Sequence, residues 1–152
     1  MLGPDDFWVS IDPGDKHVGW CEWMGEELVQ LREMSPDEAI LAAAQLEDSL
    51  LVIETYALYP HKAQLQQGSL MQTSQLVGAL RTLAYFHGCR VRMQPAAWKK
   101  PMQGAMVKRG ITLRAKDLGL SIHVQDAEIH GRIYIERQSS ADEWRTILHT
   151  KD

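Results

Sequence analysis

The sequence predicts an α/β fold in which helices flank a five-stranded mixed sheet. Three short segments rich in β-forming residues follow one another through tight turns over residues 7–34, which is typical of an antiparallel meander. Beyond residue 34, helical and strand-like segments alternate, and a strand that follows a helix usually pairs in parallel with an earlier strand. Both kinds of pairing in one chain predict a mixed sheet.

The predicted elements follow from apolar periodicity and from turn and cap residues. Ser35, Pro36 and Glu38 form a capping box with proline at the first helical position, so a helix should begin there. The helix at 102–117 is expected to break or bend at Gly104 and Gly110. We predict strands at 7–12, 17–23, 28–34, 50–54 and 89–93, and helices at 35–46, 69–87, 102–117, 121–137 and 139–148.

The length of 152 residues predicts a single domain, 1–152, large enough to bury a core. Apolar residues make up 45% of the chain and charged residues 24%, as in ordinary globular proteins. No apolar run could span a membrane, and the first residues lack signal-peptide features, so we expect a cytoplasmic protein without a membrane partner. Cys21 and Cys89 have no C-x-x-C spacing and are expected to be free thiols.

Two of the predicted strands end in an acid. The first strand ends at Asp12, directly before Pro13 and Gly14, and the fourth strand ends at Glu54. A buried, unpaired carboxylate is costly, so each acid should project from the sheet edge, where it could bind a metal. If these two strands pair in parallel, their carboxyl ends meet and Glu54 should lie near Asp12. Alternatively, Asp12 begins an Asx-turn and Glu54 is a solvated strand end.

A second pair of candidate ligands lies near the start of the helix predicted at 121–137. His123 and Asp126 are three residues apart and therefore share one helix face. Together with Asp12 and Glu54 they offer the oxygen and nitrogen ligands that suit Mg²⁺ or Mn²⁺. Two such ions could activate a water and stabilise a leaving oxygen in phosphodiester hydrolysis. Without cations these acids would repel one another, although His123 alone could be an ordinary surface histidine.

Charge is distributed unevenly along the chain, although the formal net charge is only −4. Residues 1–54 are strongly acidic, whereas residues 55–116 contain no acid at all. A basic half of this kind suggests a face that binds a polyanion such as DNA, unless the charges are scattered by chance. The basic residues of this half are Lys62, Arg81, Arg90, Arg92, Lys99, Lys100, Lys108, Arg109, Arg114 and Lys116.

The segment 56–68 has no regular period and is expected to be a loop beside the candidate site. Tyr56 and Tyr59 lie in it, within the basic half of the chain. Aromatic side chains in such a loop can stack on unpaired bases. They could equally well pack on the domain surface.

The order of these motifs resembles the RNase H-like nuclease superfamily and, within it, the RuvC family of Holliday-junction resolvases, especially small phage-encoded members. The resemblance covers roughly residues 7–137. It rests on four stretches: Ile11-Asp12-Pro13-Gly14, Val52-Ile53-Glu54, Pro95-Ala96-Ala97-Trp98-Lys99 and His123-Val124-Gln125-Asp126-Ala127. Asp-Pro-Gly alone is a weak signal, but Glu54 combined with His-x-x-Asp-Ala is much more specific.

The resemblance implies an Mg²⁺- or Mn²⁺-dependent endodeoxyribonuclease that binds a four-way DNA junction as a homodimer and nicks two opposed strands. Asp12, Glu54 and Asp126 match the family's metal-binding carboxylates, and His123 matches a position that is Asp in many bacterial members and His in others. Two metal ions per active site are implied.

The resemblance also implies DNA contacts. Lys99 matches a DNA-contacting lysine, and Lys108 or Arg109 could match a second, while Lys100 and Arg114 are further candidates from the basic half. Ala57 stands where the family has a base-stacking aromatic, so Tyr56 or Tyr59 would have to replace it. Without that aromatic, action could extend to other branched DNA.

The dimer is expected to form largely through the helix at 69–87, because its apolar faces exceed what one core needs. Two alternatives to a junction resolvase remain at this point. One is an RNase H-like nuclease acting on flaps, forks or RNA–DNA hybrids. The other is a non-catalytic module that binds branched DNA and would not need the four candidate ligands together.

Overall fold

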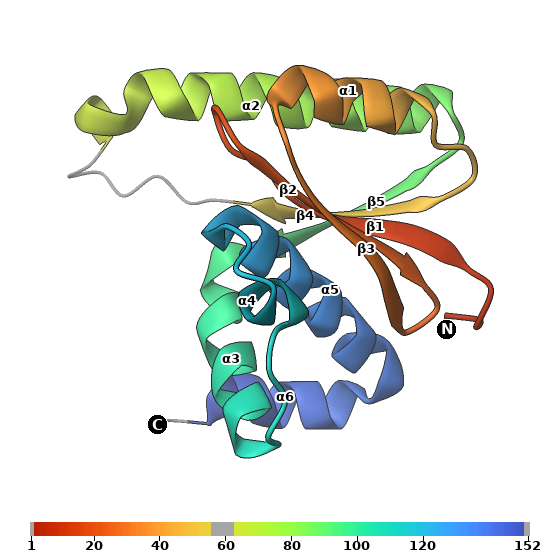
Figure 1. The fold of residues 1–152 in the computed structure, drawn as a ribbon, viewed down its shortest axis with the longest axis vertical. Helices are drawn as coiled ribbons and strands as arrows, with labels where there is room; N and C mark the ends of the chain where they lie inside the picture. The colour runs from red at the N-terminus through yellow and green to blue at the C-terminus, as the bar shows by residue number, and fades with distance from the viewer. Residues whose placement is uncertain (1, 56–62, 151–152) are drawn as a thin grey trace.

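The computed structural model describes residues 2–55 and 63–150, and Figure 1 gives their arrangement. A five-stranded sheet in the order β3-β2-β1-β4-β5 forms its centre. The strands are β1 (Phe7–Asp12), β2 (Val18–Met24), β3 (Glu27–Met34), β4 (Leu50–Thr55) and β5 (Arg90–Pro95). The helices are α1 (Pro36–Ala44), α2 (Ala63–Phe86), α3 (Lys99–Lys108), α4 (Arg114–Asp117), α5 (Ile122–Ser139) and α6 (Ala141–His149), with a 3₁₀ turn at Ala96–Trp98.

The predicted mixed sheet is confirmed. β1 pairs antiparallel with β2, and β2 pairs antiparallel with β3, which completes the meander. β4 follows α1 and pairs parallel with β1, and β5 pairs parallel with β4. The carboxyl ends of β1, β4 and β5 therefore lie along one edge of the sheet.

The two faces of the sheet are covered by different helices (Figure 1). Alternate side chains of β1 serve the two faces: Val9 and Ile11 pack with α1 and α2, whereas Trp8 packs with α5. The second face continues outward into a smaller core between α3, α5 and α6. That outer core contains Met102, Met106, Leu113, Ile129, Ile133, Trp144 and Ile147.

Two glycines permit a close approach between helix α5 and the sheet. A Cβ on Gly131 would collide with the ring of Trp23, and a Cβ on Gly19 would collide with the backbone of His123. The buried hydroxyl of Ser10 joins the two layers, since it donates to the Ala127 carbonyl at 2.7 Å and accepts from Trp23 Nε1 at 2.9 Å. These contacts set the height of α5 above β1 and β2.

Most local signals in the sequence correspond to the observed elements. The capping box is present, because Ser35 accepts from the Glu38 amide while the Glu38 side chain accepts from the Ser35 amide. The predicted break at Gly110 is confirmed, and its φ of +68° is the left-handed conformation that glycine adopts without strain. No break occurs at Gly104, which lies inside α3.

One prediction about a segment needs correction. The part of the expected loop 56–68 that the structure describes is helical, because α2 already begins at Ala63. Its glutamines are good helix formers, and a neighbouring stretch of the same helix packs on the core. Tyr56 and Tyr59 fall outside the described residues.

None of the helices in the described part of the chain is both long enough and apolar enough to cross a lipid bilayer.

Candidate metal centre

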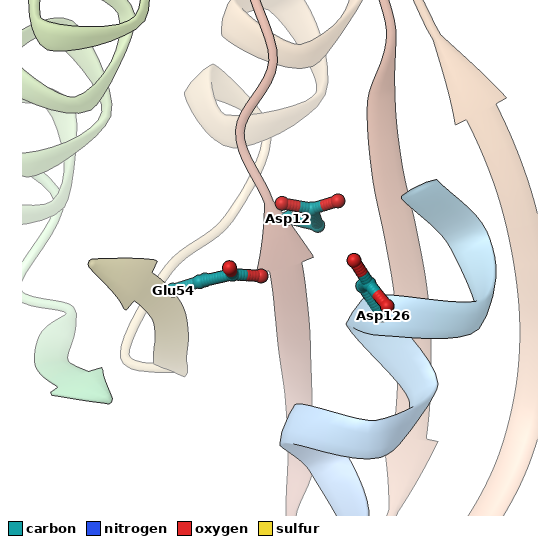
Figure 2. Close-up of side chains that lie close together, drawn as sticks. All are labelled: Asp12, Glu54 and Asp126. Atoms are coloured by element: carbon teal, nitrogen blue, oxygen red, sulfur yellow. The ribbon is translucent and has the colours of Figure 1, made fainter. Parts of the chain in front are cut away.

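Three carboxylates meet above the edge where β1 and β4 end (Figure 2). Asp12 is the last residue of β1, Glu54 lies one residue before the end of β4, and Asp126 lies in the second turn of α5. One ligand oxygen from each can be chosen so that all three lie within 4.8 Å of one another. Residues 12, 54 and 126 are thus neighbours in space although they are far apart in the sequence.

Strand alternation explains why the acids face α5. Residues on a strand point to alternate sides, so Asp12 faces the same way as Trp8 and Ser10, toward α5. On β4, Glu54 has the same parity as Leu50 and Val52, which also face α5. Parallel pairing of Ile11 with Ile53 then brings the two strand ends together. The expected proximity of Glu54 to Asp12 is confirmed.

Asp12 and Glu54 are both largely buried, but their different neighbours shift their pKa values in opposite directions. Asp12 is 8% exposed, and burial, followed by repulsion from Glu54 and Asp126, raises its pKa from 3.8 to about 9. Burial also tends to raise the pKa of Glu54, but His130 and Lys99 outweigh burial and lower it to about 2. A cluster in which one acid retains its proton is what crowded carboxylates without a cation should show.

Lys99 contacts two of the three acids. Its Nζ atom lies 2.8 Å from Asp126 Oδ2 and 3.0 Å from Glu54 Oε1. Burial lowers the pKa of Lys99, but these ion pairs outweigh burial and raise it above its usual value. The ammonium group therefore neutralises part of the negative charge of the cluster.

His123 reaches the cluster from its outer side. Its Nδ1 lies 3.2 Å from Asp12 Oδ2, and its ring stacks on that of His17 with centroids 5.9 Å apart. Among the described residues, the group of close potential ligands contains Asp12, Glu54 and Asp126 but not His123. His123 thus contacts one ligand of the cluster rather than sharing its centre.

Sequence reasoning missed two residues beneath the cluster. His130 and Gln94 are both fully buried, and His130 Nε2 lies 3.3 Å from Glu54 Oε2. His130 follows Asp126 by four residues, so the spacing argument applied to His123 would also have placed it on that helix face. Gln94 shares the parity of Glu54 on the neighbouring strand, and the two are register partners.

The remaining predicted residues are dispersed. Lys100 and Lys108 are exposed on α3. Arg109 pairs with Glu136, and Arg114 donates to the Leu28 carbonyl on β3 at 3.0 Å. Within the part of the chain that the structure describes, the three carboxylates of the cluster pair with lysine and histidine side chains and with neither of these arginines. Arg81, one of the basic residues of the acid-free half, lines an open cavity of about 320 Å³ together with Glu54.

The donor set fits a hard divalent cation. Three carboxylates supply oxygen ligands, as Mg²⁺ and Mn²⁺ prefer. Burial and then repulsion from the neighbouring acids raise the pKa of Asp12, and a cation would relieve that repulsion. Thiol ligands are absent from this cluster, which disfavours a structural zinc site. The cluster is therefore a candidate site for divalent metal.

No family model matches the sequence, and no curated protein matches it. Comparison with solved structures gives a different result. The RuvC of T. thermophilus in complex with a Holliday junction substrate superposes with a TM-score of 0.61 at 16% identity, covering 89% of this chain and 97% of that one. The chain has the RuvC fold. A second Thermus thermophilus RuvC structure gives a TM-score of 0.56 at 18% identity, with coverages of 88% and 96%.

This structural similarity confirms the fold that the sequence motifs predicted. The match spans almost the whole of the RuvC chains, so the sheet and its helices on both faces belong to the shared architecture. The two chains nonetheless share few side chains, since the sequence identity is only 16%.

Proposed function

We propose that this protein is a divalent-metal-dependent endodeoxyribonuclease that resolves four-way DNA junctions by paired nicks. The observation that carries the proposal is the cluster of Asp12, Glu54 and Asp126, whose ligand atoms lie within 4.8 Å on a RuvC fold. A solved structure with this fold is RuvC bound to a Holliday junction substrate. The proposed substrates include other branched DNA. We further propose that residues 1–152 form a single nuclease domain.

We assign the metal to the three carboxylates, with His123 at the outer side of Asp12. Two Mg²⁺ or Mn²⁺ ions bound there would supply an activated water and charge stabilisation for phosphodiester hydrolysis. Asp12, Glu54 and Asp126 would hold them as oxygen ligands. His123 would bind one ion or accept a proton from the attacking water, because its Nδ1 already lies 3.2 Å from Asp12.

Lys99 has a different role in this scheme from a simple DNA contact. Its ammonium pairs with Glu54 and Asp126 in the protein described here. A metal-loaded cluster needs less positive charge from the protein, so Lys99 would be free to contact the phosphate at the scissile position. The same side chain would thus pair with the carboxylates in the metal-free protein and with a DNA phosphate in the metal-loaded protein.

The proposed DNA surface starts at the cluster and extends along α3. Residues 55–116 contain no acid, and the exposed Lys100 and Lys108 lie on α3, which begins at Lys99. Arg81 adds a cation to the cavity beside Glu54. Phosphate contacts of this kind give affinity without sequence preference. Arg109, Arg114, Tyr56 and Tyr59 remain candidates for further contacts.

A homodimer is part of the proposal, because two opposed nicks in a symmetric junction suit a two-fold protein. Helix α2 supports it. Met71, Tyr85 and Phe86 are 58%, 81% and 76% exposed on this helix, which is unusual for large apolar side chains. Gly78 leaves open space beside the same helix, so a second helix could approach closely.

The direct test offers labelled four-way junctions, forks, flaps and RNA–DNA hybrids to the purified protein, with and without Mg²⁺ or Mn²⁺. We expect cation-dependent nicks on the four-way junction at a higher rate than on the other substrates. A preference for hybrids or flaps would favour an RNase H-like nuclease of another specificity. Cation-independent binding without cleavage would favour a non-catalytic module. Asp126→Asn is the control that should bind but not cut.

A further inference from the structure

Glu54 is the outermost member of a buried polar group that extends beneath the carboxylate cluster. The group consists of Glu54 on β4, Gln94 on β5 and His130 on α5. Glu54 is 7% exposed, and the other two are fully buried. Polar side chains at such depth are retained at a cost in stability, so their arrangement needs an explanation.

Gln94 determines which nitrogen of His130 carries the proton. The Gln94 amide nitrogen lies 2.8 Å from the His130 carbonyl oxygen, which can only accept, so this atom must be the amide donor. The same nitrogen lies 3.1 Å from His130 Nδ1, which must therefore be unprotonated. The imidazole proton is thereby assigned to Nε2, on the side that faces Glu54.

The contact between His130 and Glu54 is close but not ideal. Nε2 and Oε2 are 3.3 Å apart, and within the described residues neither atom has an aligned hydrogen-bond partner. Gln94 Oε1 is also buried, with no hydrogen-bond partner in the part of the chain that the structure describes. Three buried polar atoms without aligned hydrogen-bond partners among the described residues lower the stability of the fold, because each loses its contacts with water. Apolar side chains could fill this space without that cost, so stability alone does not explain the group.

We propose that His130 is a positioning residue: through its Nε2–H it holds Oε2 of Glu54, which leaves Oε1 turned toward the shared site for the cation. The two oxygens of Glu54 already have different neighbours, His130 for Oε2 and Lys99 for Oε1. Glutamate has three rotatable bonds, so a fixed inner partner removes much of the freedom that metal binding would otherwise have to restrict. The inference rests on the proposed metal-dependent function.

The test compares His130→Leu with His130→Gln. Leucine fills the space without a donor, whereas the glutamine amide can place a donor near the position of Nε2. Binding of Mn²⁺ to the DNA-free protein is measured by electron paramagnetic resonance, and single-junction cleavage gives kcat and KM. We expect His130→Leu to bind Mn²⁺ about 10- to 100-fold more weakly and to lose kcat with little change in KM. His130→Gln should recover most of the lost affinity.

Two further variants separate positioning from general damage to the core. Ser10→Ala removes another buried hydrogen-bonding side chain beneath α5, one that contacts Trp23 and Ala127 but no carboxylate. It should lower the melting temperature while leaving Mn²⁺ affinity unchanged. Gln94→Met frees the imidazole to take its other tautomer and should weaken Mn²⁺ binding less than His130→Leu does. If His130→Leu does not fold, Gln94→Met and His130→Gln carry the comparison.

The outcomes are distinct. Equal Mn²⁺ affinity in the wild type, Gln94→Met and a folded His130→Leu would overturn the inference. So would a His130→Gln variant as weak as the leucine variant, because the imidazole shape rather than its donor would then matter. If the wild type itself neither binds Mn²⁺ nor cleaves junctions, the proposed function fails instead, and the inference fails with it.

Discussion

The Nζ atom of Lys99 lies 2.8 Å from Oδ2 of Asp126, inside the carboxylate cluster. Without it, three crowded acids lose their nearest positive charge. We therefore predict that Lys99→Met lowers the free energy of unfolding in EDTA by about 1–3 kcal/mol. Saturating Mg²⁺ should offset most of this loss, so the Mg²⁺-dependent rise in melting temperature should be larger in the variant than in the wild type. Equal melting temperatures in EDTA would contradict the prediction.

The neighbouring Lys100 provides a matched comparison, because it has the same charge but is exposed. Lys100→Met should change the free energy of unfolding by less than about 0.5 kcal/mol. It should instead weaken junction binding in EDTA and reduce the slope of log affinity against log salt by about one unit. Fluorescence anisotropy at several salt concentrations measures this slope. An unchanged slope would mean that Lys100 does not contact DNA.

The raised pKa of Asp12 predicts an unusual pH dependence. In the folded, metal-free protein Asp12 keeps its proton to about pH 9, whereas in the unfolded chain it loses the proton near its ordinary pKa of 3.8. The folded state then binds more protons between these values, so the stabilisation is fully present below pH 3.8 and is lost as pH rises toward 9.

Asp12→Asn should remove this dependence, because asparagine does not ionise. At pH 8 in EDTA we expect the variant to be more stable than the wild type by at least about 1 kcal/mol, while cleavage is lost. In the wild type, apparent Mg²⁺ affinity should rise with pH over the same window, because the cation displaces a proton. Thermal melts in EDTA from pH 5 to pH 9 measure the first effect. A wild type whose stability rises steadily over this range relative to Asp12→Asn would be inconsistent with a protonated Asp12.

The close packing of α5 on the sheet predicts that substitution of Gly131 strongly lowers the free energy of unfolding. Its missing Cβ leaves room for the Trp23 ring, so Gly131→Ala should force the helix away from the sheet and cost at least about 2 kcal/mol. Gly68→Ala is the control, since Gly68 lies in α2 with open space around it and alanine should stabilise that helix by about 0.5–1 kcal/mol. Chemical denaturation compares the two variants. Equal stability changes would mean that α5 does not depend on Gly131.

The exposed ring of Tyr85 is a site at which the proposed dimer interface can be tested. Tyr85→Lys places a charge on the apolar surface of α2, where it should break a symmetric interface without disturbing the core. We expect the wild type to sediment as a dimer at micromolar concentration and Tyr85→Lys as a monomer with wild-type helix content. The exposed Leu41, on α1, is a control position whose change to lysine should leave the dimer intact. A monomeric wild type that still resolves junctions would exclude this part of the account.

Much of this architecture could be predicted because its signals are local. Apolar alternation defines β1 and β4, the capping box at Ser35 begins α1, and acids at two strand ends indicate a common edge. Parallel pairing then converts a pattern along the chain into proximity between Asp12 and Glu54. These inferences need only the neighbours of each residue and the rules of strand pairing.

The features that sequence reasoning missed depend on contacts between distant elements. Lys99 was interpreted as a DNA contact, yet the ion pairs that it makes with Glu54 and Asp126 depend on how α3 meets α5. Gln94 has no distinguishing local pattern. His130 has the spacing that places it on the helix face of Asp126, but its contact with Gln94 joins α5 to β5 and cannot be read from that spacing. The start of α2 at Ala63 was missed because a glutamine-rich stretch has no apolar period.

The central claim is coordinated cleavage of a four-way junction, and a supercoiled plasmid that extrudes a cruciform tests it most directly. Two opposed nicks made before the complex dissociates give linear plasmid, whereas independent nicks give nicked circles because the cruciform is reabsorbed after the first cut. With Mg²⁺, the account predicts linear product from the wild type and none from Glu54→Gln. Nicked circles alone, or cutting by Glu54→Gln at the wild-type rate, would contradict it.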